Sequence, residues 1–498
     1  MAENSALLMR AIGDELAQRM IPELTSADAR ERATLAKMVL EQLAADLDVL
    51  PEVAQRGLAQ EFSREIEIAL QALPALGLAE QIQMWRSQLG SIAAEPGVAT
   101  QRRMESLRAL AASIVRHAAD LGNDADMRAS VSRLGTVDHR WLTNYEAARQ
   151  QKSAQRTAAS PSQAEDAAPP RAAVPEPTAG TVTQYLRRRF PSVRLESTAV
   201  VPIPGGRSKK TFFISLEAND TLPLELVMRQ DYALRYEGTK VRDEYTPLLK
   251  LAQRGLAVPR PLHLEADESE LGPPFLLMQR LPGGPPGSYF GMRTPCPGAF
   301  RELARMLAQL HRIPPAELGF AAPAPGTSDS LLLLIETYQR KWRENATRAS
   351  PLIDYAYAWA KAECTKDPSS LAIVHGDAGP YNLLIDNDRL SALLDWEFVH
   401  VGDPAVDLGI VRVYAEEFMN WDDFVAEYTA AGAVAVPERR VQLGMLVNFL
   451  KGTTLVATSG RNFEEGWTRE FVKGANSFTG LRLIELRIAA LMQRFGAV

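Results

Sequence analysis

Four polar residues with the chemistry for phosphoryl transfer lie within the stretch IVHGDAGPYNLLIDNDRLSALLD, residues 373–395. They are His375, Asp377, Asn382 and Asp395. Transfer of a phosphoryl group from ATP needs a carboxylate that receives or orients the proton of the acceptor hydroxyl, and oxygen ligands that hold Mg²⁺ across the phosphates. Asp377 suits the first task, whereas Asn382 and Asp395 suit the second.

The spacing of these residues supports the same chemistry. Asp377 and Asn382 are five positions apart, as are the Asp and Asn of the kinase loop H-R-D-x-x-x-x-N. The apolar residues 383–385 predict a short strand, DNDR a turn and LSALLD a returning strand. Such a hairpin would bring Asp395 back beside Asn382. A His-Gly-Asp turn that merely caps a helix is the alternative, but it leaves Asp395 unexplained.

A break in composition separates these residues from the N-terminal part of the chain. Residues 151–180 contain one sizeable aliphatic residue, Val174, among Ala, Pro, Ser and charges, so they are expected to form an extended Pro/Ala-rich linker. Residues 1–150 carry apolar stripes at helical spacing, separated by loops that contain proline. We predict an all-α domain of unknown role, which folds by itself and docks on the rest of the chain or on a partner protein.

The chain after the linker changes from strands to helices. Residues 181–286 hold several segments rich in β-branched and aromatic residues, with one helix among them. Residues 287–498 are mostly helical in pattern and contain the loop described above. This order predicts an α+β fold, with a small β-rich lobe followed by a larger helical lobe.

Composition excludes several classes of protein. The formal net charge of −6 argues against a nucleic-acid partner, which would be met by a basic face. The two cysteines, Cys296 and Cys364, lie far apart and predict neither a disulfide framework nor a cysteine metal site. No apolar run is long enough to span a membrane, and no secretory signal is visible. A cytoplasmic location is therefore expected.

The motifs HGDAGPYN and LLDWE resemble those of the aminoglycoside phosphotransferase-type branch of the kinase-like superfamily, and the similarity covers about residues 180–498. The resemblance implies a two-lobed kinase-like fold, ATP and Mg²⁺ as cofactors, and a small-molecule acceptor. It further implies that Asp377 is the catalytic base, that His375 supports its loop, and that Asn382 and Asp395 are the Mg²⁺ ligands. In GDPAVDLG, Asp407 is expected to brace the catalytic loop rather than take part in the chemistry.

The resemblance also implies a nucleotide site in the small lobe. Arg229 stands where protein kinases have a strand lysine, and Glu244 on the following helix is its expected partner. A solvated charged face is the alternative for this pair. GGRSKKTF resembles the turn that covers the nucleotide, although an ordinary hairpin would also explain it, and FLLMQRLPGG resembles the connection between lobes. The other residues expected at the nucleotide are Gly205, Gly206, Ser208, Met278, Gln279 and Leu281.

The acceptor is less constrained by the sequence. Absence of an A-P-E-terminated activation segment argues against a protein kinase. The chain looks nearest to the subgroup that phosphorylates hydroxyacyl-CoA, which is related to the kinase domains joined to acyl-CoA dehydrogenases. The cations of YQRKWREN could bind the phosphates of CoA. One alternative is an antibiotic or amino-alcohol kinase, and the other is a catalytically inactive binding protein. The acidic residues that would suit a cationic antibiotic are Glu416, Glu417, Asp422, Asp423 and Glu427.

Overall fold

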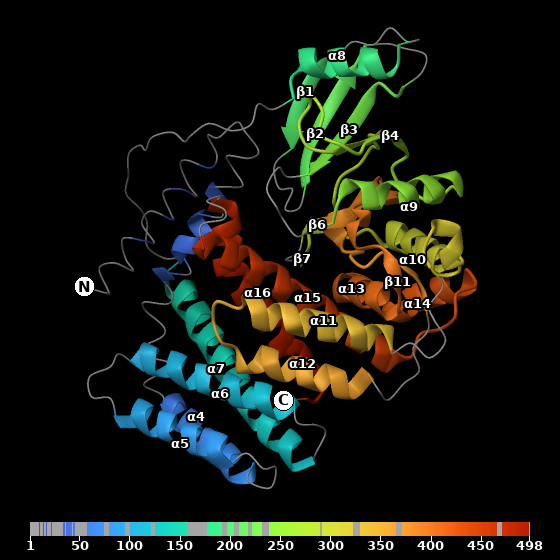
Figure 1. The fold of residues 1–498 in the computed structure, drawn as a ribbon. Helices are drawn as coiled ribbons and strands as arrows, with labels where there is room; N and C mark the ends of the chain where they lie inside the picture. Colours follow the sequence, from blue (N-terminus) through green and yellow to red (C-terminus); the bar gives the residue numbers. More distant parts are fainter. Residues whose placement is uncertain are drawn as a thin grey trace. The chain divides into compact units, whose positions relative to one another are not determined.

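The structure is a computed structural model that divides by its packing into two compact units (Figure 1). The first comprises Met1–Asp166, Leu332–Lys366 and Phe449–Val498, and the second comprises Ala167–Leu331 and Asp367–Asn448. The residues that the structure describes are single positions between 9 and 44 and the ranges 57–73, 79–94, 100–120, 125–156, 177–191, 197–203, 209–217, 222–231, 239–288, 291–321, 329–364, 371–465 and 471–497.

The second unit begins with a small lobe built on an antiparallel sheet of five strands, in the order β1-β2-β3-β5-β4. Successive side chains of a strand point to opposite faces, so β5 contributes to two cores. Phe275 and Leu277 pack with α8, whereas Leu276 and Met278 pack with α9. The elements of this lobe are α8 (Ala179–Arg189), β1 (Ser197–Ile203), β2 (Lys209–Leu216), β3 (Glu225–Asp231), α9 (Val241–Gln253), β4 (Pro261–Glu265) and β5 (Phe275–Gln279).

The rest of the second unit is the large lobe, in which helices surround two short two-stranded sheets. One is the hairpin of β9 and β10 that the sequence predicts, and the other pairs β8 with β11. A small hairpin of β6 and β7 precedes α10. The elements are β6 (Gly287–Ser288), β7 (Gly291–Met292), α10 (Pro297–His311), η4 (Pro315–Leu318), β8 (Ala372–Val374), η5 (Pro380–Asn382), β9 (Leu383–Asp386), β10 (Arg389–Leu393), η6 (Trp396–Phe398), β11 (His400–Gly402), α13 (Ala405–Ala415), α14 (Trp421–Ala430) and the start of α15 (Glu438–Glu464).

The tip of the β9–β10 hairpin is fixed on α10. The carboxylate of Asp388 accepts hydrogen bonds from the backbone N–H groups of Gly298 and Ala299, at 3.1 and 3.2 Å. These N–H groups lie in the first turn of α10, where the helix offers no acceptor of its own. A carboxylate at this end also suits the helix dipole. The hairpin that leads to Asp395 is thereby anchored at its tip.

Helices α13 and α15 cross at an unusually short separation, which two glycines permit. A Cβ atom on Gly444 would lie 1.8 Å from the carbonyl oxygen of Ala405. A Cβ atom on Gly409 would lie 2.3 Å from the carbonyl carbon of Gly444. Asn448 closes the crossing, because its Nδ2 donates to the carbonyl oxygens of Val406 and Gly444, each at 2.8 Å. This crossing holds the helix that carries Asp407.

We expect Gly444→Ala to lower the free energy of unfolding by roughly 1–3 kcal/mol, because the new methyl group forces two backbones apart. The usual gain from replacing a helical glycine, up to about 1 kcal/mol, is outweighed here. Gly480→Ala on α16 is the matched control, since its Cβ would meet Val456 at an ordinary 3.6 Å. Chemical denaturation of both variants measures the difference, and equal stabilities would contradict the tight crossing.

The first unit combines helices from both ends of the chain. Helix α12 packs on α6 and α7, and α16 packs on α7 and α12. In Figure 1, α4 to α7 lie together with α12. The elements are α4 (Ala59–Ala72), α5 (Ala79–Ala94), α6 (Thr100–Asp120), α7 (Ala125–Arg156), most of α11 (Ser330–Asn345), α12 (Pro351–Cys364), the C-terminal part of α15, and α16 (Phe471–Arg494).

A buried ion network joins these helices. Arg108 on α6 donates to Asp138 on α7 at 2.6 Å and to Glu485 on α16 at 3.2 Å. Glu485 also accepts from Arg348, at 3.2 Å. Burial by itself would raise the pKa of Glu485, but the surrounding guanidinium groups outweigh it and hold the pKa at about 2. Glu485 therefore stays ionised, and the charges of α6, α7, α16 and the connection between α11 and α12 compensate one another.

The two packing units do not have the same boundaries as the domains expected from the sequence. Helices α12 and α16 fall within the expected range 287–498, yet they bury their apolar faces against α6 and α7. The expected linker also begins with helix, because α7 continues to Arg156, while α8 already starts at Ala179. Residues 157–176 lie outside the described residues. Independent folding of residues 1–150 stays a prediction.

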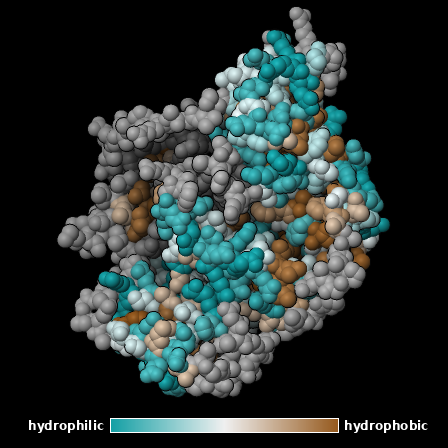
Figure 2. Space-filling model, in the orientation of Figure 1, coloured by the Kyte–Doolittle hydropathy of each residue, from teal (hydrophilic) through white to brown (hydrophobic). Residues whose placement is uncertain are grey.

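No helix among the described ranges is both long and apolar enough to cross a membrane. On the face drawn in Figure 2, hydrophilic and hydrophobic residues are interspersed over the described surface.

Candidate active site

The loop that the sequence predicts to be catalytic follows β8, and Asp407 of α13 holds its backbone. The carboxylate of Asp407 accepts the backbone N–H groups of His375 and Gly376, at 2.8 and 2.7 Å, and contacts Nε2 of His311 at 3.1 Å. Burial would raise the pKa of Asp407, but the hydrogen bond and charge of His311 lower it below its usual range. Asp407 thus has the bracing position that the family resemblance implies.

Gly376 is required in this loop. Its φ of 81° lies in the left-handed region, and a Cβ there would meet the carbonyl oxygen of Phe398 at 2.7 Å. This glycine lets the loop turn sharply between His375 and Asp377.

His375 supports the loop from within. Its side chain is fully buried, with Nδ1 accepting the backbone N–H of Asp377 at 3.1 Å and Nε2 lying 2.9 Å from the carbonyl oxygen of Leu394. The ring packs edge-on against Trp396, with centroids 4.6 Å apart. Burial lowers the pKa of His375, so the ring is neutral and donates from Nε2. His375 therefore links the backbone of Asp377 to that of Leu394, which precedes Asp395.

Asp377 is oriented by two donors from the same loop. Its Oδ1 accepts the hydroxyl of Tyr381 at 3.1 Å, and its Oδ2 accepts Nδ2 of Asn382 at 2.9 Å. The same Nδ2 also donates to the carbonyl oxygen of Asp377, at 2.9 Å. Because both N–H groups of Asn382 are directed at Asp377, its Oδ1 is the side-chain atom that can ligate a cation. Tyr381 was not anticipated from the sequence, although it lies inside the HGDAGPYN motif.

Asp395 lies beside Asn382, as the predicted hairpin requires. Leu393 pairs with Leu383 across the hairpin, and the N–H of Leu394 donates to the carbonyl oxygen of Asn382 at 2.7 Å. Asp395 itself has a φ of 63°, in the left-handed region. Aspartate and asparagine tolerate this region better than most other residues. The backbone therefore presents Asp395 at a turn that few side chains would accept.

Arg229 on β3 meets two of the expected carboxylates. Its Nη2 donates to Asp395 at 2.7 Å and to Glu244 of α9 at 3.3 Å. Burial opposes the charge of Arg229, but Asp395 and Glu244 outweigh it and raise its pKa. Burial raises the pKa of Glu244 to about 7, whereas Arg229 outweighs burial at Asp395 and lowers its pKa. The arrangement has one firm ion pair, Arg229 with Asp395, and a weaker contact to Glu244.

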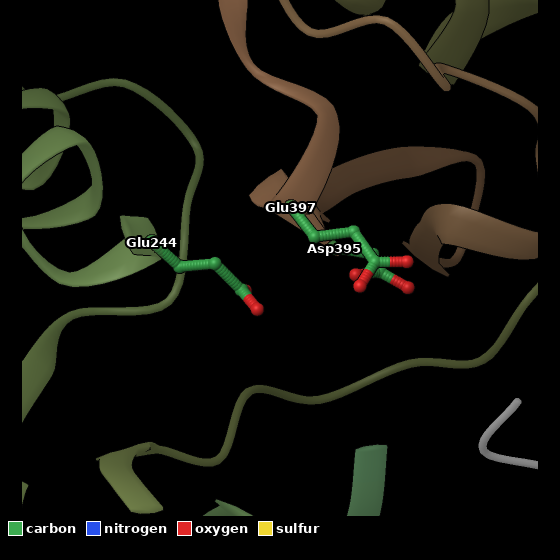
Figure 3. Close-up of side chains that lie close together, drawn as sticks. All are labelled: Glu244, Asp395 and Glu397. Atoms are coloured by element: carbon green, nitrogen blue, oxygen red, sulfur yellow. The ribbon is translucent and has the colours of Figure 1, made fainter. Parts of the chain in front are cut away.

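Three carboxylates converge at this point. Oxygen atoms of Glu244, Asp395 and Glu397 lie within 4.8 Å of one another. Figure 3 shows Glu244 reaching from α9 toward the turn that carries Asp395 and Glu397. Carboxylate and amide oxygens are the ligands that Mg²⁺ prefers, so the donor set of Asn382 and Asp395 fits this ion. The buried Nε of Arg229 has no hydrogen-bond partner among the described residues, which fits an oxygen of a bound phosphate.

A second cation, Lys209, was missed by the sequence analysis. It is the first residue of β2, is buried, and donates to Glu397 at 3.2 Å and to the carbonyl oxygen of Thr239 at 2.6 Å. The available signal was its place directly after the residues GGRS. Nothing in the sequence pairs it with Glu397.

The remaining residues expected at the nucleotide lie along the lobe connection or outside the described part. Gly205, Gly206 and Ser208 belong to residues 204–208, which are not described. Met278 is buried on β5 among the core side chains shared with α9. The N–H of Gln279 donates to the carbonyl oxygen of Arg260 at 3.0 Å, and Leu281 is half-buried just after the strand. Their contact with adenine stays a prediction.

The acidic residues considered for a cationic acceptor are largely engaged within the protein. Glu416 accepts from Arg412 at 2.7 Å, and Glu427 accepts from Arg305 at 2.7 Å. Glu417 accepts the backbone N–H of Met292 at 3.0 Å. These carboxylates therefore fix the helices after residue 405 and the β6–β7 hairpin.

A small antiparallel lobe, a carboxylate loop braced by a helix and an acidic turn beside it together define a kinase-like phosphotransferase fold. Residues 199–441 match the model of the phosphotransferase enzyme family, APH. This part of the chain belongs to that family.

Three relatives illustrate the range of the similarity. Acyl-CoA dehydrogenase family member 11 of Gallus gallus is 26% identical over 252 residues, which cover 49% of this chain and 31% of that protein. Viomycin phosphotransferase of Streptomyces vinaceus is 27% identical over 179 residues, covering 33% of this chain and 59% of that protein. A thermostable mutant of an aminoglycoside phosphotransferase, solved in a ternary complex with AMP-PNP and hygromycin B, aligns with a TM-score of 0.41 and 16% identity over 62% of this chain and 99% of that one. The chain spans about a third of the length of the first relative.

Proposed function

We propose that the protein transfers the γ-phosphoryl group of ATP to a hydroxyl group of a small molecule, with Mg²⁺ as cofactor. The observation that carries this proposal is the loop in which Tyr381 and Asn382 orient Asp377, while Asp395 follows Leu394, whose N–H donates to the carbonyl oxygen of Asn382. This arrangement supports the proposal, because phosphoryl transfer needs a carboxylate for the acceptor proton close to oxygen atoms that could hold a metal.

The reaction assigns each residue one task. Asp377 receives the proton of the acceptor hydroxyl as the acceptor oxygen bonds to the γ-phosphorus and the bond from that phosphorus to the β–γ bridging oxygen breaks, leaving ADP. Asn382 and Asp395 would hold Mg²⁺, which neutralises charge on the phosphates. The planar guanidinium group of Arg229 can donate two hydrogen bonds to phosphate oxygens, and Glu244 holds this group in position.

For the acceptor, we propose a hydroxyacyl-CoA or a similar small carboxylic metabolite. The family resemblance to the kinase domains joined to acyl-CoA dehydrogenases supports this choice, as does the match to such a protein of Gallus gallus. An antibiotic or amino-alcohol acceptor is the second candidate, which the similarity to viomycin phosphotransferase favours. The internal engagement of Glu416, Glu417 and Glu427 speaks against it, because these carboxylates have protein partners already.

Release of ADP in the presence of a panel of hydroxyacyl-CoAs, aminoglycosides and amino alcohols tests the proposal. We expect Mg²⁺-dependent turnover with at least one hydroxyacyl-CoA. Efficient phosphorylation of kanamycin-like amines, with no turnover of any hydroxyacyl-CoA, would contradict the proposed acceptor. The proposal that the protein is a phosphotransferase would stand. Absence of ATP binding would instead favour an inactive kinase-like binding protein.

A further inference from the structure

Lys209 occupies a position that needs an explanation, because a fully buried lysine is rare unless it is paired. Its ammonium group contacts three elements of the second unit. It donates to Glu397 of the turn at η6, to Thr239 just before α9, and lies 3.8 Å from Asp231 at the end of β3. Lys209 is thus a hub between the sheet, α9 and the acidic turn.

Neighbouring contacts extend this hub. The hydroxyl of Thr239 donates to the same Oε2 of Glu397, at 2.6 Å. Oδ1 of Asp231 accepts the N–H of Val241, the first residue of α9, at 3.1 Å. The start of α9, which carries Glu244 one turn later, is therefore fixed to the sheet and to the acidic turn through one group of contacts.

The acidic turn is held by two cations from adjacent strands, and the two pairs differ in exposure. Arg229 pairs with Asp395, whose side chain is 29% exposed, whereas Lys209 pairs with Glu397, whose side chain is 7% exposed. A ligand can reach the first carboxylate far more readily than the second. Asp395 can therefore leave Arg229 for a cation, while Glu397 stays with Lys209.

We propose that Lys209 is a positioning residue of the phosphotransferase site, which keeps Glu397 paired and so holds the Asp395 turn and the start of α9 on the sheet of the small lobe when the nucleotide binds. The inference rests on the proposed function. In this arrangement Glu397 is a structural anchor and not a metal ligand, although it lies within the carboxylate cluster of Figure 3. The metal site is left to Asn382 and Asp395.

Removing one partner of this pair has a different consequence from removing both. Lys209→Met leaves Glu397 as a buried carboxylate without its cation. Glu397→Gln leaves Lys209 as a buried ammonium group without that carboxylate. The double variant removes both charges and keeps the volume of both side chains. It should therefore be less impaired than Lys209→Met alone, a pattern that two independent residues would not give.

We expect Lys209→Met to raise KM for Mg²⁺–ATP about tenfold, because the competent arrangement of turn and α9 falls to about a tenth of the population. At saturating nucleotide, kcat should stay within about threefold of wild type. Lys209→Arg, which retains the charge, should recover most of the affinity. Lys210→Met is the matched control, since it removes the next lysine of β2, which is less buried.

The measurements are steady-state ADP release, calorimetric binding of Mg²⁺–AMP-PNP, and thermal unfolding of every variant. A Lys209→Met protein that unfolds early can still be judged by the double variant, which restores the charge balance. Identical nucleotide affinity in Lys209→Met and Lys210→Met would overturn the inference, as would KM increases that multiply in the double variant. A wild-type protein that does not bind Mg²⁺–AMP-PNP would overturn the proposed function itself.

Discussion

Asp377→Asn should lower kcat by about two to four orders of magnitude, which corresponds to roughly 3–5 kcal/mol of barrier. Asparagine has nearly the shape of aspartate but cannot receive the proton of the acceptor hydroxyl. The amide offers one acceptor oxygen where the carboxylate offers two, so Tyr381 would have to accept a hydrogen bond from the amide where it now donates one. Affinity for ATP should change little, because Asp377 serves the acceptor side.

Asp386→Asn is the control for this experiment. Asp386 lies on β9, only a few residues further along the chain, but its side chain is exposed and contacts Asn387. It should show wild-type kcat. Near-normal turnover by Asp377→Asn would mean that another group receives the proton.

Asp395→Asn should abolish Mg²⁺-dependent turnover of ATP. Loss of one anionic ligand removes most of the charge stabilisation that the metal gives, about 4 kcal/mol or three orders of magnitude in kcat. Asparagine is preferred to alanine here because it also tolerates the left-handed backbone at φ 63°. The protein should therefore remain folded, and calorimetry should show a weaker dependence of AMP-PNP binding on Mg²⁺.

The pH dependence of the same site distinguishes Asp395 from other groups. Burial opposes its ionisation, but Arg229 outweighs it and holds the pKa of Asp395 below its usual range. The carboxylate is thus ionised throughout the neutral and mildly acidic range. Its contribution to Mg²⁺ affinity is lost only as the pH falls through its lowered pKa, below the usual value for an aspartate. Loss of Mg²⁺ affinity between pH 7 and 6 would instead point to Glu244, whose pKa burial raises to about 7. Unchanged turnover in Asp395→Asn after metal removal and re-addition would exclude Asp395 as a ligand.

The catalytic loop could be predicted because its geometry is local. Asp377 and Asn382 are close in sequence, and the DNDR turn sets the register that returns Asp395. Short loops and hairpins depend mainly on the residues within them, so spacing carries their structure. The sheet and α9 followed in the same way from alternating strands and a helical stripe. The partnership of Arg229 with Glu244 came from family resemblance, and its geometry is present.

The hub at Lys209 could not be predicted, because its contacts join residues distant in sequence. Lys209 and Glu397 are 188 positions apart, and Arg229 and Asp395 are 166 apart. Each residue is by itself an ordinary charge that a solvated surface would also accommodate. Only the closed arrangement of β2, β3 and the acidic turn decides which cation meets which carboxylate.

The buried ion network of the first unit could not be predicted either, because its residues are also distant in sequence. Helix α7 does carry a buried stripe, but Asp138 interrupts it between Leu134 and Trp141. A buried carboxylate in a stripe is intelligible only with its partner, Arg108, and with Glu485, which lies 377 positions from Arg108. The sequence by itself determined the catalytic loop, the strand-to-helix order and the family, since these depend on neighbours along the chain. The tertiary structure alone decided which helices share a core and which charges are paired, because burial and charge compensation depend on residues that only folding brings together.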